Sequence, residues 1–423
     1  MRYLSRVVLT GFAALLLVSA ARAENWPQWR GPRNDGVSAE TGLPTSWSLD
    51  ENLKWRAELP GAAGSTPVVW GDRIFLTSAD SGKVSLICMT TAGEELWRRP
   101  FGAENWEVRG GEGNAASSSP STDGEHVYAF AGNGDFASYT LDGEEAWATN
   151  LEDRYGQFDM FFVMATTPWL DGDRLYLQLI HSNGWLVLAF DKNTGDELWK
   201  HKRKSDAHSE CEQSYASAFL YRDDDREFLL SHGADYVTAH SLADGGELWR
   251  CGGLNPRDSY NPSLRFVASP VAVPGLIVVP SAKNGPVLGL SPDASGDISD
   301  SDEGHVWTRP RGTPDVPSPL IHDGLVYLCR ENGNLIVMDA ETGEELYDET
   351  THRHRHRASP VYADGKVYLT ARDGVVTVVR AGRMFEILAS NELGETVSSS
   401  PVVSNGTVYF RTYDALWAVS EGG

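Results

Sequence analysis

The sequence has little cysteine and few long apolar runs, and each shortage excludes a class of protein. Only four cysteines occur among 423 residues, and their spacing matches neither a zinc knuckle nor a c-type haem motif. Beyond the first 20 residues, no segment stays apolar for long enough to cross a bilayer. We therefore expect no membrane span in the mature chain.

Positive charge is scarce as well. The chain carries 36 Lys and Arg against 59 Asp and Glu, a formal net charge of −23. An acidic surface repels nucleic-acid backbones and anionic lipid. Nucleic acid is therefore excluded as a partner, and the acid excess is expected to serve solubility.

The first 23 residues predict a secretory signal peptide. Arg2 and Arg6 precede an apolar stretch at 7–20, and the tripeptide Ala-Arg-Ala at 21–23 fits a small-x-small cleavage site. No cysteine follows this stretch directly, so no lipid anchor is expected there. A periplasmic or secreted location follows.

Export permits disulfides but does not require them. Cys88 and Cys329 lie in apolar, strand-like runs and are expected to be buried free thiols. Cys211 and Cys251 flank one repeat unit, and the sequence leaves open whether they form a bridge.

Glycine, proline and tryptophan are abundant, with 42, 21 and 14 copies, which favours short strands and many turns. Five segments repeat a glycine turn followed by an aromatic residue: "TTAGEELW" (90–97), "LDGEEAW" (141–147), "DKNTGDELW" (191–199), "LADGGELW" (242–249) and "DAETGEELY" (339–347). We interpret their aromatic residues as packing between repeat units, together with two more; the full set is Trp55, Trp97, Trp147, Trp199, Trp249, Trp307 and Tyr347.

Small-residue openings recur 41 to 53 residues apart, at 65–67, 118–120, 166–168, 216–218, 268–270, 317–319, 358–360 and 399–401. The sixth unit divides into four short strands joined by turns, which is typical of a propeller blade. The eighth unit supplies only three strands, and the segment "DENLKWRAEL" (50–59) can supply the fourth. The prediction is an all-β, eight-bladed β-propeller of four-stranded antiparallel blades over 47–420, closed by the N-terminal strand and preceded by an extension at 24–46.

These units resemble PQQ-like repeats, which occur in quinoprotein alcohol dehydrogenases and in a propeller lipoprotein of outer-membrane assembly. The segment at 25–47 is similar to the start of secreted PQQ-like proteins of planctomycete-type bacteria. The resemblance implies a fold more than a function.

In the dehydrogenases of this family, an adjacent Cys-Cys pair, a calcium held by Glu, Asn and Asp, and an Asp base support the quinone. The present sequence has no Cys-Cys pair. Its acidic segment 293–303 has Ile298 where a calcium loop needs glycine, and we expect a solvated loop of blade five there. No catalytic residue, metal or cofactor is predicted. Pyrroloquinoline quinone and calcium enter only under the alternative, a periplasmic quinoprotein-type oxidoreductase.

Four links between blades break the repeat pattern, at 102–116, 152–165, 202–216 and 253–268. Such links gather on one face of a propeller, where binding usually resides. We expect a monomeric binding or scaffolding module for a protein, peptide or glycan; the alternative is that the links only cap the channel and pair with one another. The candidate ligand-binding residues are Trp106, Arg109, Glu112, Tyr155, Asp159, Glu210, Arg257, Tyr260, Arg265 and His356.

The run "THRHRHRASP" (351–360) alternates histidine and arginine. In extended chain the histidines share one side and the arginines the other. Alternate residues lie about 6–7 Å apart, too far for three histidines to hold one ion. We therefore expect a basic lining of the central channel here and not a metal site.

Overall fold

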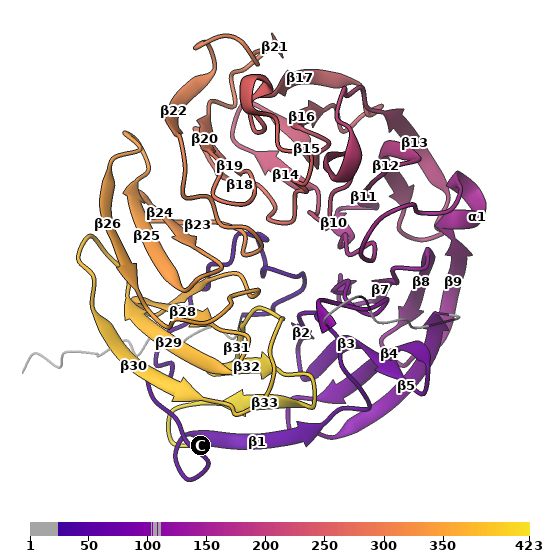
Figure 1. The fold of residues 1–423 in the computed structure, drawn as a ribbon. Helices are drawn as coiled ribbons and strands as arrows, with labels where there is room; N and C mark the ends of the chain where they lie inside the picture. The colour runs from indigo at the N-terminus through magenta and orange to yellow at the C-terminus, as the bar shows by residue number, and fades with distance from the viewer. Residues whose placement is uncertain (1–23, 103, 105–107, 109–110) are drawn as a thin grey trace, which may run out of the picture.

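The computed structural model describes residues 24–102, 104, 108 and 111–423. Eight sheets stand around a central axis like the blades of a propeller (Figure 1). Within each blade the four main strands are antiparallel neighbours. The predicted fold class is confirmed.

Blades one to four contain β2 (Val68–Trp70), β3 (Arg73–Asp80), β4 (Lys83–Thr90) and β5 (Glu95–Gly102); β6 (Ser121–Thr122), β7 (His126–Phe130), β8 (Asp135–Thr140) and β9 (Glu145–Asn150); β10 (Trp169–Asp171), β11 (Arg174–His181), β12 (Gly184–Asp191) and β13 (Glu197–Lys202); and β14 (Phe219–Arg222), β15 (Glu227–Gly233), β16 (Tyr236–His240) and β17 (Glu247–Cys251). A short helix, α1 (Leu151–Tyr155), follows blade two, and 3₁₀ turns occupy Ser209–Glu212 and Arg257–Ser259.

Blades five to eight contain β18 (Val271–Val273), β19 (Leu276–Pro280), β20 (Val287–Leu290) and β22 (His305–Arg309); β23 (Leu320–His322), β24 (Leu325–Cys329), β25 (Asn334–Asp339) and β26 (Glu345–Thr350); β27 (Val361–Ala363), β28 (Lys366–Thr370), β29 (Val375–Arg380) and β30 (Ile387–Glu392); and β31 (Val402–Ser404), β32 (Thr407–Arg411), β33 (Ala415–Val419) and β1 (Leu53–Glu58).

The two ends of the chain close the ring together. β1 pairs antiparallel with β33, from Leu53 opposite Val419 to Glu58 opposite Ala415. The C-terminus therefore lies beside β1 (Figure 1). The N-terminal strand completes blade eight, as the sequence predicts.

Blade four carries an extra strand that the sequence pattern does not reveal. β21 (Gly296–Asp297) comes from the acidic segment of blade five and pairs parallel with β17, setting Gly296 opposite Trp249. Gly296 and Asp297 are exposed, as a solvated loop requires, but Ile298 is only 3% exposed and joins the core around Trp249. The expectation of a wholly solvated loop is therefore wrong at Ile298, because its side chain covers the edge of blade four.

The repeated tryptophan and the repeated glycine turn fit each other across neighbouring blades. Trp147 Nε1 donates to the carbonyl of Lys192 at 2.8 Å. Gly195, in the same turn, has φ +70°, and a Cβ there would lie 2.7 Å from the Trp147 ring. The same docking joins Trp55 to Thr91, Trp97 to Leu141, Trp199 to Leu242 and Trp307 to Ala340. The predicted packing between blades is confirmed.

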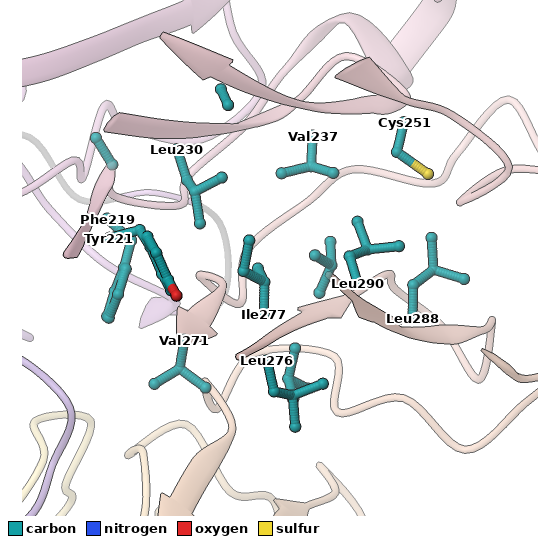
Figure 2. Packing of buried hydrophobic residues seen from close by; sticks show 14 of the residues in the cluster. Phe219, Tyr221, Leu230, Val237, Cys251, Val271, Leu276, Ile277, Leu288 and Leu290 are labelled. Carbon is teal, nitrogen blue, oxygen red and sulfur yellow. The ribbon is translucent and has the colours of Figure 1, made fainter. Parts of the chain in front are cut away.

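The core fills the spaces between adjacent sheets. Figure 2 shows Leu230 and Val237 of blade four pointing towards Ile277 and Leu290 of blade five, and all four are fully buried. Such packing accounts for most of the stabilising apolar burial.

All four cysteines are buried free thiols, so Cys211 and Cys251 form no bridge. Burial raises the pKa of the Cys329 thiol to about 12, which suppresses the reactive thiolate.

Candidate functional site

A belt of hydroxyl groups surrounds the central channel. In each opening, a backbone amide donates to a Ser or Thr hydroxyl of the next blade at 2.9–3.3 Å. The participants are Thr66, Ser119, Thr167, Ser217, Ser269, Ser318, Ser359 and Ser400. This belt satisfies buried polar groups and holds the inner strands at a common radius.

The N-terminal extension lies at one end of the channel. Trp29 lines the narrow inner cavity of about 160 Å³. Next to it, the Arg30 guanidinium is buried and donates to the carbonyls of Pro319 (2.7 Å) and Pro360 (3.3 Å). Burial lowers the pKa of Arg30 to about 10, with partial compensation from Asp35. Arg30 therefore ties the extension to the openings of blades six and seven at this end of the channel.

The other end opens into a mouth of about 540 Å³. Its walls come from all four blade-to-blade links named above, represented by Glu112, Phe162, Tyr215 and Arg265. Links after blades five and six add Val316 and Arg357, among others. The links do gather on one face, which we call the loop face.

One side of the mouth is a cluster of arginines around a glutamate. Arg355 and Arg357 contact the Glu112 carboxylate at 2.7 and 2.9 Å, and Arg372 contacts it at 3.2 Å. Glu331 takes a second contact from Arg357 at 3.0 Å. Three guanidinium groups thus share two carboxylates, and one positive charge remains in excess.

The other side of the mouth is aromatic. The Phe162 ring meets the edge of Tyr215, with centroids 5.7 Å apart, and the Arg265 guanidinium lies 4.8 Å above Phe162. Glu210 holds Arg265 in place at 2.8 Å. Beside them Phe161 is 69% exposed. A large exposed ring next to a half-buried aromatic pair is typical of an interaction surface.

The chain and known proteins can now be compared. The family model described as outer membrane protein assembly factor BamB matches residues 82–314 and 233–422, well over half of the sequence. The chain belongs to this family. No curated protein sequence matches this PQQ-like propeller significantly.

Solved structures share the fold of this BamB-like family member at low identity. BamB from Moraxella catarrhalis is 16% identical with a TM-score of 0.58, over 89% of this chain and 99% of that one. A europium-containing methanol dehydrogenase is 13% identical with a TM-score of 0.72, over 93% and 90%. Quinohemoprotein alcohol dehydrogenase from Comamonas testosteroni is 12% identical with a TM-score of 0.69, over 96% and 82%. Such identities show the fold alone.

Several sequence-predicted residues lie away from the mouth of this BamB-like propeller. Tyr155 donates to Glu197 at 2.6 Å beside α1. The backbone of Asp159 contacts His181 and Ser182 next to the β11–β12 hairpin. Tyr155 therefore lies beside the outer strand of blade three, and Asp159 lies over the hairpin between its second and third strands.

Arg257 and Tyr260 form a separate group over blade four. The Tyr260 hydroxyl donates to Asp235 at 2.7 Å, and Arg257 reaches the same carboxylate at 3.5 Å. The Tyr260 ring stacks on His208, with centroids 4.2 Å apart. Trp106 and Arg109 lie outside the described residues.

The histidine–arginine run divides by side only in part, because its backbone bends and His354 lines the same surface depression as Arg353 and Arg355. His352 and His354 face Asp373 at 2.8 and 3.7 Å, whereas Arg355 turns to Glu112. His356 is fully buried, and burial lowers its pKa to about 4.

Sequence reasoning did not identify Arg372, Phe161 or Arg330. Arg330 and Arg372 lie at the β24–β25 and β28–β29 hairpins, in "CRENGN" and "ARDG". Hairpins between the second and third strands reach the same face as the blade-to-blade links. A charged residue at the hairpin between the second and third strands of a unit was the sequence signal that could have identified Arg330 and Arg372.

The residues at the mouth do not fit the quinone of the dehydrogenases. Their arginines are already engaged by Glu112 and Glu331, whose carboxylates oppose a ligand with three carboxylates. Within the described part of the chain, no group of three or more His, Cys, Asp or Glu can hold a metal ion.

The described helices also include none long and apolar enough to span a membrane.

Proposed function

We propose that this protein is an exported, non-catalytic binding propeller that holds a partner protein on its loop face. One observation carries the proposal: the central channel opens into a mouth that is basic on one side and aromatic on the other, where Phe162 lines the wall and its chain neighbour Phe161 is 69% exposed. Aromatic and arginine side chains dominate the binding energy of protein interfaces. The family description, an assembly factor, is consistent with such a role.

The test places a photo-crosslinking amino acid at Phe161 of the full-length protein in the cells that produce it. The matched control carries the same group at Met384, which is 82% exposed in the turn between β29 and β30. We expect discrete protein adducts from position 161 and none of the same mass from position 384. Identical adducts from both positions, or none from either, would count against the proposal.

A further inference from the structure

A second depression, of about 760 Å³, adjoins the mouth between blades five and six. We call it the basic groove. Its walls are the β19–β20 loop with Lys283 and Asn284, the β24–β25 hairpin with Arg330, and the link at 353–355. The mouth and the groove share Asp315, Glu331 and Arg355, so the two form one continuous surface.

The groove has the opposite charge to the rest of the molecule. Among the described residues, four permanent cations and two carboxylates line it. The cations are Lys283, Arg330, Arg353 and Arg355, in a chain of net charge −23. Because the remaining surface repels anions, this local excess selects where an acidic ligand binds.

Both carboxylates of the groove are already engaged. Asp315 accepts the backbone N–H of Lys283 at 3.0 Å, which fixes the β19–β20 loop. Glu331 pairs with Arg357 at 3.0 Å. Glu331 is therefore largely compensated by Arg357, whereas Asp315 keeps its charge, and the described lining of four cations and two carboxylates retains a positive excess.

Three of the cations, in contrast, have no acidic partner. Within the described residues, no carboxylate lies in salt-bridge range of Lys283, Arg330 or Arg353. Asn284 Oδ1 accepts from Arg330 Nη2 at 2.8 Å and so orients this guanidinium without neutralising it. An oriented, unpaired guanidinium matches the planar geometry of a carboxylate.

The lining also narrows the class of ligand. Among the described residues, no Phe, Tyr or Trp lines the groove, so it lacks the large stacking platform suited to neutral sugars. The adjoining mouth has the half-buried ring of Phe162 in its wall, and the neighbouring ring of Phe161 is exposed; both favour an apolar group of the ligand. Acidic glycans carry carboxylates but no apolar side chain, whereas an acidic protein segment offers both.

We infer that the basic groove and the mouth together bind an extended acidic segment of the partner protein. Its carboxylates contact Lys283, Arg330 and Arg353, and one apolar side chain packs against Phe161. This inference rests on the proposed function and names the chemistry of the partner.

The test uses fluorescence anisotropy of the full mature protein with a short labelled peptide of glutamates and aspartates around one phenylalanine. The groove variant combines Lys283→Gln, Arg330→Gln and Arg353→Gln. The control variant combines Arg33→Gln, Arg380→Gln and Arg383→Gln, exposed arginines of the N-terminal extension and the β29–β30 region. Both variants lose three positive charges, so the net charge of the protein is matched. Unfolding curves verify that both variants fold.

We expect the groove variant to weaken peptide binding by about tenfold and the control variant by less than about twofold, because only contacts in the groove are lost. Raising the salt concentration from about 50 to about 300 mM should weaken wild-type binding several-fold. Replacing the peptide phenylalanine by serine should weaken binding to wild type but not to Phe161→Ala.

Equal losses in the two variants would overturn the inference, as would binding of an oligogalacturonate of equal charge with the same affinity as the peptide. No measurable binding of the peptide to wild type would overturn it too. If crosslinks at position 161 persist in that case, the binding function stands and only the acidic chemistry fails. If the crosslinks are absent as well, both proposals fail.

Discussion

The backbone amide of Ser400 donates a 3.0 Å hydrogen bond to the hydroxyl of Thr66, 334 positions away in the sequence. This contact closes the hydroxyl belt between blade eight and blade one. It depends on β1, which completes blade eight, and on the extension at one end of the channel. The two ends of the chain therefore complete the ring of blades and its central channel.

Deleting residues 24–58 should cause aggregation or lower the melting temperature by at least about 10 °C. The deletion removes β1, exposes the edge of β33, and uncovers the core in which Trp26 is fully buried. Size-exclusion chromatography with thermal unfolding measures both effects. Removing 421–423, beyond β33, is the control. A monomeric deletion variant with unchanged melting would refute closure by the N-terminal strand.

Gly195→Ala should lower the free energy of unfolding by about 3 kcal/mol, since a Cβ at φ +70° is strained and would overlap the Trp147 ring. Gly172→Ala isolates the strain, because Gly172 has φ +55° but no atom within 4 Å of its added Cβ. We expect about 1 kcal/mol for this control. Urea unfolding measures both, and equal losses would contradict the docking of turn on tryptophan.

His232 should make the protein less stable as the pH falls. Burial, with a smaller contribution from Arg203, lowers the pKa of His232 to about 3. The unfolded chain takes up this proton below about pH 6.5, but the folded chain does not until about pH 3. Between these limits acidification favours unfolding by about 1.4 kcal/mol per pH unit. The effect is absent well above pH 6.5.

His232→Leu should flatten this pH dependence while keeping the contact with Phe266, against which His232 packs edge-on at 4.9 Å. Urea unfolding at several pH values between about 4.5 and 7.5 provides the measurement. An unchanged slope in the variant would show that His232 is protonated alike in both states.

Pyrroloquinoline quinone with calcium should bind no tighter than micromolar and support no oxidation of alcohols or aldoses. The arginines around Glu112 offer weak anion binding, but their charges are largely compensated. Calorimetric titration followed by dye-reduction assays over a substrate panel tests this prediction. Sub-micromolar binding with calcium-dependent turnover would establish the oxidoreductase alternative instead.

The candidate site divides between what the sequence predicts and what it does not. Glu112, Glu210 and Arg265 were chosen because they lie in non-repetitive links, and the structure brings all three to the mouth region. Tyr155 was chosen by the same rule but contacts Glu197 at the outer edge, because a link runs from the rim to the axis. The presence of a residue in a link therefore does not show whether it lies near the central axis or at the outer rim.

The sequence by itself determined the eight units, their strand order and the glycine turns that receive the tryptophans. These features depend on contacts within a blade or between consecutive blades, so a local pattern repeated along the chain is enough to reveal them. Only the tertiary structure decided that Arg372 meets Glu112 and that Trp29 lines the channel. Those contacts join residues far apart in sequence whose distance depends on ring closure. No local pattern encodes that distance.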